Sequence, residues 1–538
     1  MTSSAMAGRW LAALGGRIAT LDAARPMVEA LLIRNGRILL AGSNDEVEAE
    51  LARLPGCDRL DLGGRVVLPG FHDSHIHALA YGLSLERVAL AGVESLKEVL
   101  ARVETAARAA PTGAWVLGWG WDHSLWRDSG GRFPDRHLLD RVAAGVPVAL
   151  RRKDGHLLWV NSAALAAAGI TRQTPDPLGG RIGRFDDGEP NGLLFESAGA
   201  LVEQAMPRPT VDEARRALLR VQAEAHRLGI TGIQVPEGRL TFEAFQLLDA
   251  AGELRLRVTM LLPYDMLDAL LAIGLRSGFG GDRLRIGGVK LFMDGSLGSQ
   301  TAALLAPFEG SAGNTGMLTM APDEARAAIE RAARGGLACA VHAIGDRANR
   351  LVLDAFEATR EVWWPAGLRQ RIEHVQLLHP DDLPRLAQLG VIASMQPIHA
   401  TQDMDLVDRL WGARGRYAYA FASLLRSGAT LAFGSDAPVE TPDPLAGLYA
   451  AVARRRPDGR PAGGWYPEER IDLQAALRAY TIGAAWAAGR PAGAGTLAPG
   501  QRADFVVLSH DVLREPPEVL LETRVEATIF DGEVVYAG

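Results

Sequence analysis

Cysteine is almost absent from this sequence. Of 538 residues only two are cysteines, Cys57 and Cys339, and they lie far apart along the chain. Two distant thiols cannot build a disulfide framework or a cysteine-based zinc cluster. The sequence therefore predicts a protein of a reducing compartment, and we expect it in the cytoplasm.

Excess positive charge and long apolar runs are also missing. The formal net charge is −7, whereas a nucleic-acid-binding protein shows a basic patch or stripe. No apolar run reaches the roughly 18 residues that a membrane span needs. Residues 1–21 lack the sustained apolar core of a signal peptide. We therefore expect no nucleic-acid partner and no membrane association.

Lysine is scarce. Lys97, Lys153 and Lys290 are the only three, against 54 arginines. Lys290 lies inside an apolar run, where burying a charged amine without compensation is costly. Arginine cannot replace a chemistry that needs a deprotonated amine. Lys290 is therefore a candidate functional residue, and the alternative is a structural ion pair with Asp294 or Glu373.

Residues 66–77 form an apolar run that ends in polar side chains. The run reads Val-Val-Leu-Pro-Gly-Phe-His-Asp-Ser-His-Ile-His, and we expect a strand over 66–73. On an extended chain, His75 and His77 point to the same face and supply half of a metal site. Such a pair is weak evidence by itself, because many are incidental.

The middle of the chain alternates apolar runs with longer helical stretches rich in alanine, leucine, arginine and glutamate. This alternation is typical of a parallel sheet connected by helices. The candidate strands are 66–73, 231–235, 254–262, 286–293, 338–343, 372–376, 391–396 and 430–434. Eight such units predict an α/β fold built on a (β/α)₈ TIM barrel.

Both ends of the chain are β-rich, with hairpin signals at Asn35-Gly36 and at Asp531-Gly532. A large insertion after the first barrel strand does not fit the barrel count. Because it follows the carboxyl end of a strand, we expect it to cover the active-site face. The predicted domains are a composite β-domain from both termini (1–64 and 496–538), the barrel (65–79 and 206–495) and the insertion (80–205).

Four later strand ends carry further candidate ligands, which are Lys290, His342, His374 and Asp436. The ends of barrel strands converge on one rim, so distant positions become neighbours. Taken alone, a buried histidine is more often a hydrogen-bonded core residue, and an aspartate before Ala-Pro can organise a turn. Together with the first histidine pair, the set predicts a metal site.

These motifs resemble the amidohydrolase superfamily, and within it the amidohydrolase-3 branch of N-substituted formamide deformylase-like hydrolases. The motifs that carry the resemblance lie at 69–77, 118–122, 290–299, 341–346, 373–374, 396–399, 434–439 and 500–507. The resemblance covers nearly the whole chain and implies the same barrel and composite β-domain. One departure is Gln300, where relatives often carry arginine, which puts an anionic substrate contact there in doubt.

The resemblance also implies roles for the ligands. One ion would be held by His75, His77 and Asp436, the other by His342 and His374, with a CO₂-derived carboxylate on Lys290 between them. Histidine and carboxylate ligands suit Zn²⁺, and Mn²⁺ or Fe²⁺ are alternatives. One ion or two, and the carboxylation itself, stay open at this point.

The expected reaction is hydrolysis of a C–N amide-type bond by a metal-activated water molecule. Asp436 would take the proton of the water and pass it to the leaving amine. The alternatives are a deaminase or cyclic amidohydrolase on the same barrel, because a fold does not fix a reaction, and a non-catalytic metal-binding relative.

Contacts with the substrate are expected from Trp119, Trp121, His156 and His399. The two tryptophans offer large apolar contact area with a polar N–H, and the glycines beside them leave room for close approach. They predict a small-molecule substrate, a neutral and hydrophobic N-acyl or N-formyl amine. The alternatives are tryptophans that form the insertion's own core and a structural His399. Assembly as a homodimer is left open.

Overall fold

The computed structural model describes residues 10–54, 56–90, 92–111, 113–130, 132–152, 157–177 and 180–538. The chain divides into two compact units, of which one is Leu83–Thr210 and the other comprises the chain before and after it. No helix among the described residues is long and apolar enough to cross a lipid bilayer. Cys57 and Cys339 are both free.

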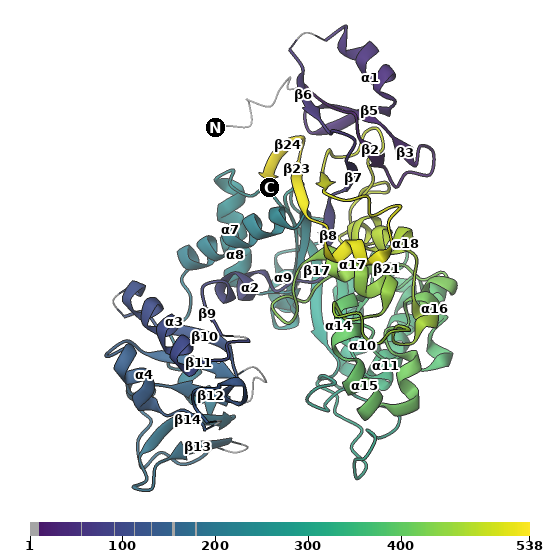
Figure 1. Ribbon diagram of the computed structural model, residues 1–538. Coiled ribbons are helices and arrows are strands. Elements are labelled where there is room, and N and C mark those ends of the chain that lie inside the picture. The colour runs from purple at the N-terminus through teal and green to yellow at the C-terminus, as the bar shows by residue number, and fades with distance from the viewer. Residues whose placement is uncertain are drawn as a thin grey trace. The chain divides into compact units, whose positions relative to one another are not determined.

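The larger unit contains an eight-stranded parallel sheet that is nearly closed (Figure 1). Its strands are β8 (Phe71–Asp73), β15 (Ile230–Val235), β16 (Arg257–Pro263), β17 (Leu284–Phe292), β18 (Ala338–Ala343), β19 (Arg371–His374), β20 (Ile392–Met395) and β21 (Leu431–Phe433). Just beyond the two edge strands, the amide of Ser74 donates to the carbonyl oxygen of Phe433 at 2.9 Å. The (β/α)₈ barrel predicted from the sequence is confirmed.

Amphipathic helices connect these strands. In α10 (Pro322–Arg334), the buried residues Ala325, Ala328, Ile329 and Ala332 recur at helical spacing and form one face. Proline begins this helix, acidic side chains occupy its first turn and arginines its last, which suits the helix dipole. The other helices of this unit are α1 (Asn44–Leu51), α2 (Ala78–Ser84), α7 (Val211–Arg227), α8 (Arg239–Ala250), α9 (Leu267–Ala272), α11 (Asp346–Ala358), α12 (Arg360–Trp363), α13 (Arg385–Leu389), α14 (Pro397–Gln402), α15 (Met404–Leu410), α16 (Phe421–Arg426), α17 (Pro444–Ala453), α18 (Leu473–Arg478) and α19 (Ala484–Ala487).

The first predicted strand, 66–73, is two strands in the structure. β7 (Val66–Pro69) pairs with β22 (Phe505–Leu508) in a different sheet, whereas β8 joins the barrel. The change occurs at Gly70, whose amide donates to the carbonyl oxygen of Asp504 at 2.9 Å. A Cβ atom at Gly70 would lie 2.5 Å from the side chain of Thr231, so only glycine fits this crossing.

Strands from both ends of the chain share the sheet that contains β7, in the order β24-β23-β22-β7-β2-β3. In Figure 1 the yellow β23 (Val525–Phe530) and β24 (Glu533–Ala537) belong to the same sheet as the purple β2 (Arg17–Ala19) and β3 (Met27–Val28). A second sheet, with the order β5-β4-β1-β6, comes from the N-terminal part alone. Its strands are β1 (Trp10–Leu14), β4 (Ala30–Arg34), β5 (Arg37–Gly42) and β6 (Asp58–Asp61).

Both predicted hairpin turns are present. Asn35 and Gly36 have φ values of 51° and 73°, and Asp531 and Gly532 have 50° and 73°. Two successive positive φ values are the requirement of a type I′ turn, which matches the twist of the flanking strands. The turns join β4 to β5 and β23 to β24.

The unit Leu83–Thr210 has a sheet of its own, with the order β13-β14-β12-β11-β10-β9. Its strands are β9 (Val88–Ala89), β10 (Val116–Trp121), β11 (Val148–Arg152), β12 (Leu157–Val160), β13 (Gly180–Arg184) and β14 (Pro190–Glu196). Its helices are α3 (Leu96–Ala109), α4 (Arg136–Val142), α5 (Ser162–Ala167) and α6 (Gly199–Glu203). The prediction that this insertion covers the active-site face stays a prediction.

Trp121, Trp126 and Trp159 form part of the hydrophobic core of this unit. Trp121 has no exposed surface, and its indole N–H donates to the carbonyl oxygen of Leu150 at 2.8 Å. A buried indole needs such a partner, so the ring and its polar end are both occupied. The predicted substrate contact of Trp121 does not fit this burial. Trp119 is 42% exposed, and its role stays a prediction.

Candidate metal centre

Asp73, the last residue of β8, connects the two loops that carry the first candidate ligands. Its carboxylate accepts the amides of His75 and Ser435 at 2.9 and 3.1 Å and the hydroxyl of Ser435 at 2.5 Å. His75 and His77 thus lie in the loop after β8, just beyond the predicted strand 66–73. Asp73 is not among the residues predicted from the sequence, although it lies where a barrel strand ends.

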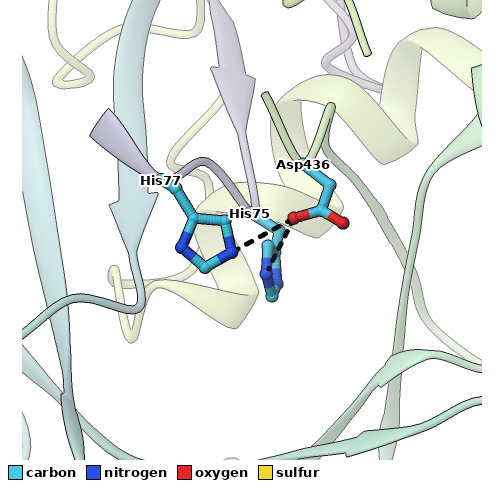
Figure 2. A group of neighbouring side chains, drawn as sticks. All are labelled: His75, His77 and Asp436. Atoms are coloured by element: carbon cyan, nitrogen blue, oxygen red, sulfur yellow. Dashed lines mark ion pairs between the residues drawn. The ribbon is translucent and has the colours of Figure 1, made fainter. Parts of the chain in front are cut away.

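His75, His77 and Asp436 converge at this rim, and Figure 2 shows their side chains pointing toward one another. Oδ1 of Asp436 lies 3.3 Å from Nε2 of His77 and 3.5 Å from Nε2 of His75. Burial alone would raise the pKa of Asp436, but the hydrogen bond from His77 and the nearby imidazoles of His75 and His374 hold it well below its usual range. An ionised carboxylate and two imidazoles so close together can hold a divalent cation.

Hydrogen bonds fix the orientation of two buried histidines. Nδ1 of His75 lies 2.7 Å from Oε2 of Glu373, and Nδ1 of His374 lies 2.8 Å from Oε1 of Gln396. Because these oxygens accept, each Nδ1 donates and each Nε2 keeps its lone pair. Histidines that bind metals are held in this way by a second partner.

Glu373 is in turn held by Arg371, with Nε of the arginine 2.5 Å from Oε1 of the glutamate. Burial alone would raise the pKa of Glu373, but the charges of Arg371 and His75 hold it well below its usual range. Both members of the pair are almost completely buried. A buried ion pair of this kind is strongly destabilised when one partner is removed, so it fixes the position of His75.

A second group of ligand atoms consists of His374, His399 and Asp436. His399 belongs to α14, and its ring is nearly parallel to that of His374, with centroids 6.4 Å apart. Its Nε2 is buried without a hydrogen-bond partner among the described residues. The sequence predicts a substrate contact for His399, whereas the structure places it among the candidate ligands. One feature of the sequence does point to His399 as a ligand. His399 closely follows a barrel strand, as the predicted ligands do.

His342 lies beside His374, with ring centroids 4.6 Å apart, but in neither group of ligand atoms found among the described residues. Its Nε2 donates to the carbonyl oxygen of Gly295 at 2.9 Å, which leaves Nδ1 with its lone pair. Burial and the neighbouring Lys290 lower the pKa of His342 to about 3. The imidazole is therefore neutral and retains a nitrogen able to bind a metal.

Lys290 lies in β17 with 2% of its surface exposed. Its Nζ has no hydrogen-bond partner among the described residues and lies 4.9 Å from the ring centroid of Phe292. Lys290 forms no close ion pair with Asp294 or Glu373 among the described residues, although the charge of Glu373 favours its charged form. Asp294 instead accepts three backbone amides. Burial lowers the pKa of Lys290 to about 8. A buried amine without a partner is unfavourable, so this site fits a group that would bind it.

One cavity of about 430 Å³ is lined by all the candidate ligands, namely His75, His77, Lys290, His342, His374, His399 and Asp436. Its apolar lining includes Phe292, Leu297, Ile344 and Val439, and its acidic lining Asp403 and Glu440. Thus the structure brings together every predicted ligand at the carboxyl ends of the barrel strands. Of the other predicted contacts, Trp119 and Trp121 belong to the unit Leu83–Thr210, and His156 lies outside the described residues.

Comparison with known proteins decides the family. Residues 58–536 match the amidohydrolase family. The chain belongs to that family. This amidohydrolase is 37% identical to the protein LONG AFTER FAR-RED 3 of Arabidopsis thaliana, over 97% of its own length and 90% of that protein. It is 30% identical to the N-substituted formamide deformylase of Arthrobacter pascens, over 98% of both chains.

A solved structure is similar over nearly the whole chain. The crystal structure of an uncharacterized metal-dependent hydrolase from Pyrococcus horikoshii OT3 superposes with a TM-score of 0.79 at 31% identity, over 98% of this amidohydrolase and 100% of that chain. The amidohydrolase is thus a member of a family of metal-dependent hydrolases, and its histidine and aspartate groups are able to bind a metal.

Replacing Glu373 with glutamine should weaken metal binding by this amidohydrolase about 10- to 100-fold. Glutamine keeps the shape of the side chain but removes the charge that orients His75 and neutralises Arg371. Competition with a coloured chelator measures the affinity, and circular dichroism checks that the variant is folded. Glu50→Gln, on a partly exposed residue of α1, is the matched control. Unchanged affinity in a folded Glu373→Gln protein would show that His75 does not need this partner.

Proposed function

We propose that this amidohydrolase hydrolyses a C–N amide-type bond of an N-acyl or N-formyl amine, using one or two divalent ions. Zn²⁺ suits the ligands best, with Mn²⁺ and Fe²⁺ as alternatives. The observation that carries the proposal is the position of Asp436, which both ligand groups share. When bound, the ion would act as a Lewis acid. It would polarise a carbonyl group and lower the pKa of a bound water molecule towards neutrality.

Asp436 is the proposed general base. Its low pKa keeps the carboxylate ionised at neutral pH, so it is able to accept a proton. Its φ of 60° lies in the left-handed region, which non-glycine residues adopt rarely and which is common at functional sites. In the proposed reaction Asp436 takes the proton of the attacking water and gives it to the nitrogen of the leaving amine.

Lys290 is the proposed site of a CO₂-derived carboxylate. The free amine is the form that reacts with CO₂, and a pKa of about 8 leaves a part of the population in that form at neutral pH. The reaction would form an N–C bond, release one proton, and convert a buried amine without a hydrogen-bond partner into an anionic ligand. Its position in the same cavity as the histidines supports this role.

The proposed substrate is a neutral, hydrophobic amide. Four apolar side chains line the cavity, and large apolar contact area favours hydrophobic substituents. Apart from Lys290, the described residues of the lining include no lysine or arginine that would bind a carboxylate. Asp403 and Glu440 would repel one, and they suit an amine product instead. Similarity to an N-substituted formamide deformylase also supports an N-formyl amine.

A kinetic screen with controlled metal content tests the proposal. The panel holds N-benzyl and N-alkyl formamides, the matching acetamides and a carboxylate-bearing N-formyl amino acid. We expect the highest kcat/KM for the neutral hydrophobic compounds, loss of activity after treatment with a chelator, and recovery with Zn²⁺ or Mn²⁺. Full activity in a verified metal-free preparation contradicts metal dependence. Turnover confined to amino-heterocycles or cyclic amides would favour the alternative reactions.

A further inference from the structure

A second cavity, of about 110 Å³, lies at the opposite end of the barrel from the candidate metal centre. Its lining includes residues at or near the beginnings of three barrel strands, namely His72 of β8, Thr231 of β15 and Arg257 of β16. The remaining lining comes largely from the segment 490–504. The cavity therefore lies where the barrel meets the sheet formed by both ends of the chain.

Arginines are the most numerous charged residues in the lining of this cavity. Arg37, Arg257, Arg490 and Arg502 face only two acidic side chains, Asp282 and Asp504, among the described lining residues. Two of these four arginines are in close ion pairs, whereas Arg37 donates to the carbonyl oxygen of Gly500. Arg257 binds Asp504 at 2.5 Å and the nearby Asp531 at 2.6 Å, and Arg502 contacts both Asp282 and Asp531.

Arg490 is buried and has no close carboxylate. It is 6% exposed, and its Nη1 donates to the carbonyl oxygen of Asp282 at 2.8 Å. Its Nε and Nη2 have no hydrogen-bond partner among the described residues. The carboxylate oxygen Oδ1 of Asp282 lies 4.0 Å from Nη1, and Arg502 contacts the other oxygen of that carboxylate. Nε and Nη2 form one edge of the planar guanidinium, which is spaced to bind two oxygens of a single anion.

Two more nitrogen atoms in the same cavity lack hydrogen-bond partners within the described part of the chain. They are Nε2 of His72, which is 6% exposed, and Nη1 of Arg257, which is 7% exposed. Burial and the charge of Arg490 lower the pKa of His72 to about 3, so its ring is neutral. Burial and the neighbouring Arg285 and Arg257 lower the pKa of Arg490 to about 9. Buried polar groups are almost always satisfied, so unpaired donors in one cavity indicate a missing acceptor.

We propose that this cavity binds a small inorganic oxyanion of the sulfate and phosphate class. The free edge of Arg490 would hold two of its oxygens, and Nη1 of Arg257 and, in the tautomer protonated at Nε2, His72 would donate to the others. Water can accept these hydrogen bonds but cannot neutralise the guanidinium, whereas an anion does both. Because the site lies at the beginnings of the strands, its expected effect is on stability and not on the chemical step.

Thermal unfolding of the full chain with its metal complement tests the proposal. Sulfate is titrated against sodium chloride at matched ionic strength, and we expect a saturable rise in Tm with sulfate alone. Arg490→Met should lose the saturable rise. Arg326→Met, at an exposed residue of α10, should keep it. An equal rise in the Arg490→Met protein would place the ion elsewhere and overturn the proposal, as would a saturable effect of chloride without one of sulfate.

Crystals of the unaltered protein soaked in selenate provide a second measurement, which decides the question if Arg490→Met does not fold. Anomalous density within hydrogen-bonding distance of Nε and Nη2 of Arg490 is the expected result. A cavity without anomalous density at selenate concentrations that saturate the Tm effect would overturn the proposal. Neither measurement depends on the substrate. A negative result would therefore overturn the proposed anion site without affecting the proposed amide hydrolysis.

Discussion

Replacing Asp436 with asparagine is expected to lower kcat by roughly 10³-fold or more while the fold survives. Asparagine has nearly the same shape but no charge, so it can neither accept the proton of the attacking water nor act as an anionic ligand. The effect should be large because Asp436 belongs to both groups of ligand atoms. Steady-state kinetics with saturating metal, together with measured metal content, separates the loss of the base from the loss of the ion.

Asp381→Asn is the matched control for this variant, because the Asp381 side chain is 81% exposed and lies outside the described cavity lining. It should keep full activity. Circular dichroism and Tm of the Asp436→Asn protein show whether it is folded. If a folded Asp436→Asn protein retains its metal and loses less than roughly tenfold in kcat, the general base must be another residue.

Replacing Lys290 with arginine is expected to abolish most activity and to reduce bound metal. Arginine keeps the positive charge but cannot form the proposed carboxylate, and its larger guanidinium would lie in a completely buried position. Elemental analysis measures the metal content. When the unaltered protein is incubated with ¹³C-labelled bicarbonate, its ¹³C NMR spectrum should show a carbamate carbon signal that the variant lacks.

Lys97→Arg makes the same exchange at an exposed position and should change neither metal content nor activity. A Lys290→Ala variant adds a further comparison, because a small added carboxylic acid could occupy the vacated space and partly restore activity. Full metal content and full activity in Lys290→Arg would show that Lys290 has a structural role only.

Features set by local chemistry were predictable from the sequence. Asn35-Gly36 required positive φ values and formed the expected turn, because few other residues tolerate that backbone. The crossing at Gly70 was not predictable, since one continuous apolar run can pass from one sheet to another without a change in hydrophobic pattern. Its glycine is needed because of Thr231, which is distant in sequence and near only in the folded barrel.

The candidate site was predictable as a set but not in the arrangement of its members. Convergence of strand ends in a barrel was enough to bring His75, Lys290 and Asp436 into one cavity. Hydrogen-bond partners such as Gln396, together with ring orientation, decide which nitrogen of each histidine is able to bind a metal. The spacing of residues along the sequence determines neither. The burial of Trp121 likewise depends on its neighbours in the core of the insertion.

The pairing of β7 with β22 has a consequence for folding during synthesis. Val67 pairs with Val507, so a long stretch of chain separates the partners, and β22 leaves the ribosome only after all of that stretch has been synthesised. At about 5–20 residues per second, β7 must wait on the order of tens of seconds for its neighbour. Until then an apolar strand beside the histidine loop has an unpaired edge, which is open to association with other nascent chains. A chaperone that shields this segment would therefore raise the yield of folded enzyme more than it would change the stability of the finished protein.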